Sequence, residues 1–317
     1  MALLEVRNLS VTFDFLEGKV QAVRDVNFEI EKGEILGIVG ESGCGKSVMA
    51  KSIMRLICDD YCNLAGNILF NDVDLLTMSE EHLQKIRGNF ISMAFQNPLS
   101  SLNPVLTIGL QVAEPFLIHT DMSRKDAFLK AQEMISKVGI SDPETRLLQY
   151  PHQISGGMRQ RVAIAMALAL EPQILIADEV TTALDVTVQA QIIELLKKLN
   201  KELSSSIMFI THDLALLTNI CHRVIVMYAG QIVESASVDE LYNDPKHPYT
   251  KSLLQSIPRI DKKKKSLTSI PGSVIDLRDL PDGCAFFARC SFRKDVCKTS
   301  PELQQIGAKR FCRCHCL

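Results

Sequence analysis

The sequence predicts an α/β protein built around a parallel sheet. Short apolar runs with the length of buried strands occur at residues 35–39, 174–177, 207–210 and 224–227. An amphipathic helix is expected over residues 186–203, between the second and third of these runs. Strands that alternate with helices in this way are typical of a parallel sheet covered by helices. The second observation that favours this class is a glycine-rich turn directly after the first strand.

That turn is residues 40–47, Gly-Glu-Ser-Gly-Cys-Gly-Lys-Ser, a complete Gly-x-x-x-x-Gly-Lys-Ser pattern, with a helix expected over 47–56. The glycines let backbone N–H groups close around a phosphate, and the helix dipole adds positive charge. Lys46 is expected to reach the β- and γ-phosphates, and Ser47 to bind Mg²⁺. The predicted nucleotide contacts are Gly40, Ser42, Gly43, Cys44, Gly45, Lys46, Ser47 and Val48.

Two acidic residues end the next apolar strand. Leu175, Ile176 and Ala177 are followed by Asp178 and Glu179. Beside a phosphate loop, a carboxylate at a strand end suits Mg²⁺, and a second one suits the activation of water. Asp178 is therefore predicted to hold Mg²⁺, directly or through water, and Glu179 to polarise the attacking water.

A second anion-binding helix terminus is predicted at residues 154–161, Ile-Ser-Gly-Gly-Met-Arg-Gln-Arg. Ser155 is a suitable N-cap for a helix over 155–170, and Gly156 and Gly157 leave the backbone open to a ligand. One nucleotide needs only one phosphate loop. The simplest hypothesis is that this second terminus serves a nucleotide held by another subunit.

The composition, the net charge and the apolar pattern of the chain argue against several classes of protein. The 317 residues predict one or two domains, and the 46% of hydrophobic residues suffices for a full core. A net charge of −2 does not favour nucleic-acid binding, so no nucleic-acid partner is expected. The first residues lack the pattern of a secretory signal, and no apolar run reaches membrane length. A cytosolic protein is expected, with any membrane association made through partners.

Together these motifs resemble those of the ATP-binding subunits of ABC transporters, over essentially the whole chain. The resemblance implies that Gln96 contacts Mg²⁺ or water and reports to membrane subunits, and that Asp185 lies at a dimer interface. It also implies that His212 contacts the γ-phosphate. Phe13 is the expected adenine-stacking residue, with Phe15 as an alternative because the loop here is longer.

The resemblance also implies the organisation of the chain. Residues 1–235 are expected to form an ABC-type P-loop NTPase with an antiparallel β subdomain and a helical subdomain at about 98–158. Residues 236–317 are expected to form a C-terminal extension.

One residue departs from the family pattern: Val180 stands where proline usually follows the catalytic glutamate. Both carboxylates remain, so hydrolysis is still expected.

Within this family the chain resembles most the subunits of dipeptide and oligopeptide importers, together with nickel importers. The resemblance rests on residues 95–104, 247–258, 270–272 and 283–290. It implies ATP and Mg²⁺ as cofactors, and a peripheral position on the cytoplasmic face of the inner membrane. The implied partners are a paralogous ATPase subunit, two transmembrane permease subunits and an extracytoplasmic substrate-binding protein.

The alternative that the cargo is nickel or another solute stays open. A soluble ABC ATPase of repair or translation is disfavoured, because the chain has neither a second ATPase module nor a coiled-coil insertion.

Six of the ten cysteines fall between residues 284 and 316. In a reducing compartment such a cluster favours a metal site over disulfides. The resemblance points to Cys284, Cys290, Cys297 and Cys314 as ligands of a 4Fe-4S cluster, and Zn²⁺ would accept the same four thiolates. The identity of the fourth ligand stays open because of Cys312, Cys316 and His315. The alternative to a metal site is a set of free thiols on a small docking module.

Overall fold

The computed structural model describes residues 2–16, 18–57, 61–97, 101–182, 184–257 and 270–317. The described chain divides into two compact units. The first consists of residues 31–34 and 77–210, and the second of residues 2–30, 35–76 and 211–317. Two of the segments that carry the resemblance lie partly outside the described residues, at Pro98, Leu99 and Ser100 and at Pro258.

The first unit is built on three parallel strands, β6 (Ile91–Ala94), β7 (Ile174–Asp178) and β8 (Ser206–Thr211). Ile91 pairs with Ile174, and Ile174 pairs with Ser206. Every residue of the three strands is buried, as expected for the interior of a parallel sheet. Helices α2 (Glu80–Ile86) and α8 (Val186–Leu203) also belong to this unit.

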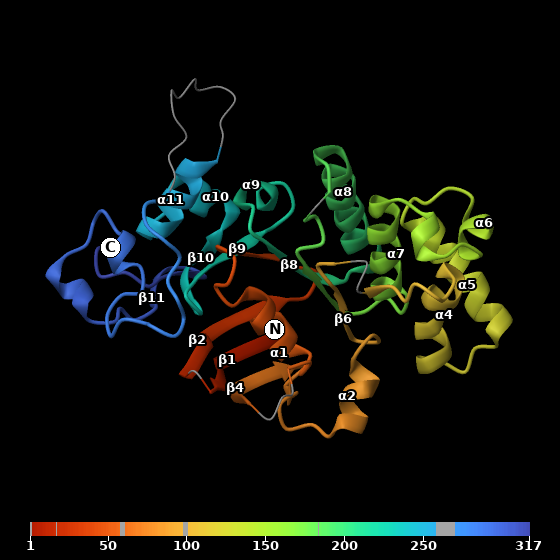
Figure 1. Cartoon of the computed structure of the whole chain (residues 1–317), viewed down its shortest axis with the longest axis horizontal. Helices are drawn as coiled ribbons and strands as arrows, with labels where there is room; N and C mark the ends of the chain where they lie inside the picture. Colours follow the sequence, from red (N-terminus) through yellow and green to blue (C-terminus); the bar gives the residue numbers. More distant parts are fainter. Residues whose placement is uncertain (1, 17, 58–60, 98–100, 183, 258–269) are drawn as a thin grey trace. The chain divides into compact units, whose positions relative to one another are not determined.

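A group of helices packs together within the first unit (Figure 1). It comprises α4 (Ile108–His119), α5 (Arg124–Lys137), α6 (Pro143–Leu147), the short 3-10 helix η1 (Pro151–Gln153) and α7 (Gly156–Leu168). The hydroxyls of Thr107 and Ser123 cap the first two helices by accepting N–H groups of the first turn. Small and apolar side chains on the facing sides form the core of the group, including Val112, Phe116, Ala131, Ile135 and Ile164.

The second unit contains a mixed sheet in the order β3-β9-β10-β12-β11. β3 (Ile35–Val39) is parallel to β9 (Arg223–Tyr228), and β9 forms a hairpin with β10 (Gln231–Ser237). Ala229 and Gly230 form the two-residue turn, with φ of 47° and 79°. The sheet continues with β12 (Arg310–Cys312) and β11 (Gln304–Gly307), both antiparallel. The C-terminal strands β11 and β12 therefore extend a sheet that also contains β3, which begins at Ile35.

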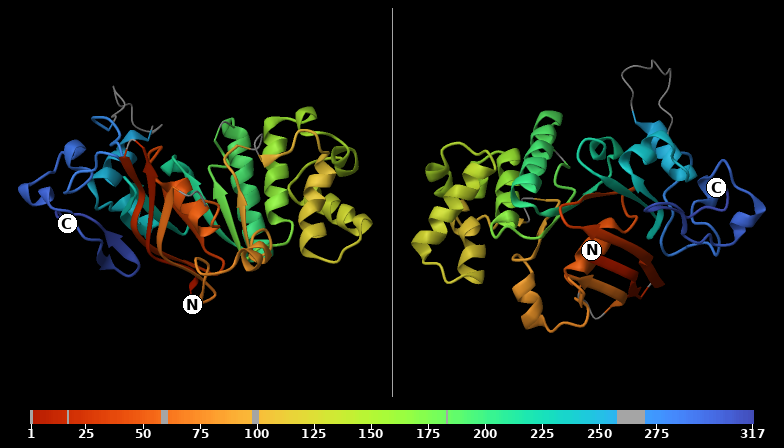
Figure 2. Two further views of the ribbon diagram at one scale, coloured as in Figure 1. Left: turned by 60° about the horizontal axis from the view of Figure 1, so that its bottom comes forward. Right: turned by 180° about the vertical axis from the view of Figure 1, so that it is seen from behind.

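A second, antiparallel sheet belongs to the same unit, in the order β2-β1-β4-β5. Its strands are β1 (Ala2–Phe15), β2 (Gly18–Glu31), β4 (Cys62–Phe70) and β5 (Val73–Asp74). Helix α1 (Lys46–Ile53) contacts β1, and Figure 2 shows it beside these red and orange strands from two further sides. The expected antiparallel β subdomain is present in this sheet.

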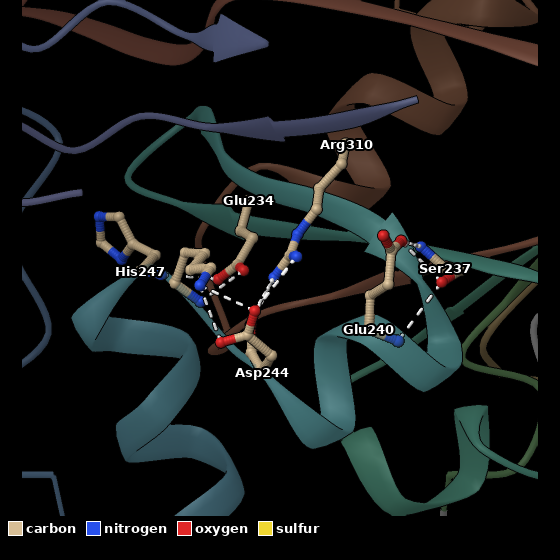
Figure 3. Close-up of polar contacts among 7 residues, drawn as sticks. Glu234, Ser237, Glu240, Asp244, His247 and Arg310 are labelled. Atoms are coloured by element: carbon tan, nitrogen blue, oxygen red, sulfur yellow. Dashed lines mark hydrogen bonds and ion pairs between the residues drawn. The ribbon is translucent and has the colours of Figure 1, made fainter. Parts of the chain in front are cut away.

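The C-terminal part of the second unit contains α9 (Leu214–Leu217), α10 (Val238–Asn243), α11 (Pro248–Ser256), η2 (Phe287–Arg289) and η3 (Asp295–Lys298). Polar contacts join its parts (Figure 3). The fully buried Glu234 carboxylate accepts the N–H groups of Lys246 at 2.7 Å and His247 at 2.8 Å. Burial raises the pKa of Glu234. Arg310 donates to both the carbonyl and the carboxylate of Asp244.

The four strand predictions and the helix over 186–203 are confirmed. Two expected helices are shorter than predicted. The helix expected over 47–56 ends at Ile53, because Arg55 adopts a left-handed φ of 46°. The helix expected over 155–170 ends at Leu168, ahead of Glu171 with φ of 50°. In the described residues, no helix has the length and apolar character that crossing a membrane requires.

Candidate functional site

The phosphate loop lies between the buried strand β3 and helix α1, as predicted. Gly45 caps the helix with φ of 101°, and a Cβ there would stand 2.2 Å from the carbonyl oxygen of Ala22. A Cβ at Gly40 would stand 2.3 Å from the carbonyl oxygen of Met227. Both positions therefore need glycine, because the neighbouring backbone leaves no room for a side chain.

Lys46 sits inside this loop with only 4% of its surface exposed. Its ammonium group donates to the carbonyl oxygens of Gly40 at 2.8 Å and Glu41 at 3.0 Å. Ser42 and Gly43 are exposed, and Ser47 and Val48 are half-buried at the start of α1. The loop thus presents an open backbone face with a lysine amine and a serine hydroxyl beside it, a suitable arrangement for a triphosphate and its Mg²⁺.

The strand-end carboxylates belong to the first unit. Asp178 is the last residue of β7 and is 3% exposed. Glu179 has a left-handed φ of 49°, and its N–H donates to the carbonyl oxygen of Ile210 at 2.9 Å. Val180 is fully buried in the core.

Gln96 and Glu179 lie together, although 83 residues separate them in the sequence. The side-chain amide of Gln96 donates to Oε2 of Glu179 at 2.8 Å. The Thr182 hydroxyl donates to the same oxygen at 3.2 Å. The carboxylate is therefore oriented by two neutral donors. Thr182 had no predicted role, because a threonine in an ordinary turn carries no distinctive signal in the sequence.

Ser155 caps α7, and its hydroxyl accepts the N–H of Met158 at 3.3 Å. The first turn of α7 contains no acidic residue, so no side-chain charge there offsets the positive end of the helix. A Cβ at Gly157 would stand 2.9 Å from a methyl group of Val188, at the start of α8. Asp185 caps α8 by accepting the N–H of Val188 at 3.0 Å. The structure therefore brings the ends of these two helices together.

Two further predicted residues belong to the second unit. His212 is exposed and directly follows β8. Phe13 is half-buried near the end of β1, and Phe15 is 58% exposed. Their rings stack on each other with centroids 6.0 Å apart and an interplanar angle of 17°. The two candidates for stacking on adenine thus lie side by side at the end of β1, and the choice of Phe13 over Phe15 stays a prediction.

Most of the clustered cysteines line one small cavity of about 10 Å³ in the second unit. Burial raises the pKa of the Cys284 and Cys290 thiols, and raises that of Cys314 to about 11. Among the described residues, no three His, Cys, Asp or Glu side chains take the arrangement of a metal site. The cavity is lined by Cys284, Cys290, Cys297, Cys314, His315 and Cys316, whereas Cys312 lies on β12.

The residues of the C-terminal extension that contact the phosphate loop were not predicted. The N–H of Glu41 donates to the hydroxyl of Tyr249 at 2.9 Å, and the Glu41 carboxylate binds Arg289. Tyr249 and Arg289 lie in two of the segments that carry the resemblance to peptide importers. A lone arginine among cysteines gives no sign of its partner, since that partner lies 248 residues away.

Known proteins resemble this chain over most of its length. Residues 23–182 match the family model described as ABC transporter, and residues 233–297 match the model of the oligopeptide/dipeptide transporter C-terminal region. The chain is 52% identical to an oligopeptide transport ATP-binding protein of Bacillus subtilis, over 93% of this chain and 83% of that protein. It is also 52% identical to a dipeptide transport ATP-binding protein of Lactococcus lactis, over 91% of this chain and 83% of that one.

Solved structures share the fold. An ATP-binding cassette determined as a dimer in a post-hydrolysis state, bound to ADP and Pi, matches with a TM-score of 0.67 and 31% identity. The match covers 74% of this chain and 98% of that chain. Another dimeric structure of the same cassette gives a TM-score of 0.66.

Proposed function

This chain belongs to the ABC transporter family of ATP-binding proteins, in the group that serves oligopeptide and dipeptide transport, and we propose that it hydrolyses ATP to power peptide import. The observation that carries the proposal is the phosphate loop, with its buried lysine and its two glycines held against backbone. The match over the C-terminal region, residues 233–297, supports peptides as the cargo.

We propose the following roles for the site residues. Lys46 and the backbone N–H groups of the loop bind the β- and γ-phosphates, and Ser47, Asp178 and Gln96 hold Mg²⁺. Mg²⁺ neutralises charge on the phosphates when bound. Glu179 polarises the attacking water. The hydrogen bond from Gln96 to Glu179 supports this role, because it fixes the carboxylate that must face the water.

Several other residues are proposed to complete the site. His212 contacts the γ-phosphate, and Phe13 stacks on adenine. Ser155, Gly156 and Gly157 bind the triphosphate held by a second ATPase subunit, with Asp185 at the same interface. The acid-free first turn of α7 supports this, since a helix N-terminus attracts anions.

We propose that the chain works at the cytoplasmic face of the membrane as a peripheral subunit. Its partners would be a paralogous ATPase subunit, two transmembrane permeases and an extracytoplasmic peptide-binding protein. The relatives named for oligopeptide and dipeptide transport support this assembly. Closure of two ATPase subunits around ATP, and reopening after hydrolysis, would drive the permeases.

Replacing Lys46 tests the function. In cells whose own copy is deleted, Lys46→Ala is expected to abolish peptide-dependent growth and uptake of a labelled dipeptide, because the triphosphate loses its buried cation. Lys51→Ala is the matched control, since Lys51 is an exposed lysine of the same helix. Peptide uptake that proceeds normally in the Lys46 variant would contradict the proposal.

We further propose that Cys284, Cys290, Cys297 and Cys314 bind a metal centre, either a 4Fe-4S cluster or Zn²⁺. Their position around one cavity supports the shared site. The described side chains around this small cavity do not take the arrangement of a metal site, so either centre requires the thiols to move. Either centre would supply a covalent link across a segment that has little core of its own.

Metal analysis of anaerobically purified protein tests this site. Bound iron with acid-labile sulfide identifies the cluster, and bound zinc identifies the single ion. Cys290→Ser is expected to lose most of the metal, whereas Cys62→Ser on β4 retains it. Correctly folded wild-type protein with neither metal would refute the proposal.

A further inference from the structure

The C-terminal extension reaches into the phosphate loop through one ion pair. Arg289 binds the carboxylate of Glu41 with both terminal nitrogens, Nη1 to Oε2 at 2.6 Å and Nη2 to Oε1 at 2.9 Å. The two side chains are only 6% and 21% exposed. A two-pronged, largely buried pair of this kind has a defined geometry, unlike an exposed ion pair on flexible side chains.

Arg289 is itself held by the rest of the extension. Its Nε donates to the carbonyl oxygen of Pro271 at 2.9 Å. Its guanidinium group lies 5.9 Å from the ring centres of both Tyr228 and Phe286. Phe286 is 2% exposed and packs edge-on against Tyr228 with centroids 5.3 Å apart. Pro271 and Phe286, from two separate segments of the extension, therefore both contact this arginine.

Tyr249 of α11 makes the second contact with Glu41. Its hydroxyl accepts the backbone N–H of Glu41 at 2.9 Å, and its side chain is fully buried. Its ring packs against Phe286, with centroids 5.4 Å apart. Both the side chain and the backbone of Glu41 are therefore fixed by residues outside the ATPase motifs. That N–H points to a tyrosine, so other N–H groups of the loop must serve the phosphate.

The carboxylate of Glu41 is electrostatically unfavourable in a phosphate-binding loop, because it repels the negatively charged ligand. The loop acts through positive charge, from Lys46 and from the start of α1. An unpaired glutamate between Gly40 and Ser42 would oppose both. Arg289 neutralises this carboxylate and, through the geometry of the pair, holds it in one direction.

We propose that Arg289 is a positioning residue of the nucleotide site that acts through charge: by pairing with Glu41 it neutralises a carboxylate in the phosphate loop, so the C-terminal extension sets the affinity for ATP. The proposal rests on the proposed function, since it presumes that this loop binds ATP. It assigns to the extension a role in nucleotide binding that is distinct from any contact with cargo or permease.

A charge series in the full-length protein tests the proposal, with the affinity for the magnesium complex of a non-hydrolysable ATP analogue as the readout. Glu41→Gln leaves an unopposed positive charge and is expected to tighten binding about fivefold, the effect of one unit charge at a few ångströms in water. Arg289→Met leaves an unopposed negative charge and is expected to weaken binding by a similar factor. The double variant is neutral again and should return to within about twofold of wild type.

A purely structural role predicts a different order, in which both single variants and the double variant all bind more weakly. Weaker binding by Glu41→Gln would therefore overturn the proposal, even if Arg289→Met failed to fold. The single-variant effects should also shrink as salt is raised. Arg278→Met is the matched control, because Arg278 forms an exposed ion pair with Asp276 in the same extension.

Lys46→Ala separates this inference from the proposed function. If that variant binds the analogue as well as wild type does, the loop is not the nucleotide site and the proposed function fails. If it loses binding while the Glu41 and Arg289 variants bind as wild type does, only the role of Arg289 is refuted.

Discussion

Glu179→Gln is expected to lower steady-state ATP turnover by at least about a hundredfold while leaving ATP binding intact. A residue that activates water by accepting its proton contributes about 10²- to 10⁴-fold, and an amide cannot accept that proton. Glutamine keeps the size of the side chain and an acceptor oxygen for Gln96 and Thr182, which bind Glu179 at 2.8 and 3.2 Å. The local structure should therefore survive the substitution.

Phosphate release measures the loss of turnover, and size-exclusion chromatography with ATP measures its consequence. Without hydrolysis the closed pair of ATPase subunits should accumulate with ATP and not with ADP. Glu171→Gln is the matched control, because Glu171 has a similar left-handed φ of 50° but pairs with Lys137 on the surface. Normal hydrolysis by the Glu179 variant would show that another group activates the water.

Ser155→Arg is expected to reduce the ATP turnover of the assembled transporter at least about a hundredfold, although this chain still binds ATP on its own phosphate loop. The reason is that Ser155 caps α7 at the exposed end that is proposed to cover the partner's nucleotide. An arginine there removes the cap and fills the space required by the triphosphate.

Two measurements on the same preparation separate the proposed shared site from a self-contained one. Photolabelling with an azido-ATP reports binding by this chain, and phosphate release reports turnover. Ser136→Arg, an exposed serine in the last turn of α5, should leave both unchanged. Loss of labelling of this chain by Ser155→Arg would place the serine in its own nucleotide site. Full turnover by strictly monomeric protein would also refute the shared site.

Much of the fold follows from short-range properties that a sequence displays directly. The strand, glycine turn and helix of the phosphate loop occupy consecutive residues, so their order alone predicts the cradle at residues 40–47. Side-chain caps act over three residues, and the predicted cap at Ser155 is present. Helix α8 begins and ends where its amphipathic pattern does. The exact ends of other helices were missed where a left-handed residue stopped them early.

The local elements and the motifs that bind a phosphate are thus predictable from the sequence, because each depends on neighbours along the chain. Which distant groups meet depends on the packing of the folded chain. It placed β12 beside β10, joined Gln96 to Glu179, and brought Arg289 to Glu41 across 248 residues. Such pairs arise from the packing of buried side chains such as Phe286 and Tyr249, whose partners are selected by shape and burial and leave no periodic trace in the sequence.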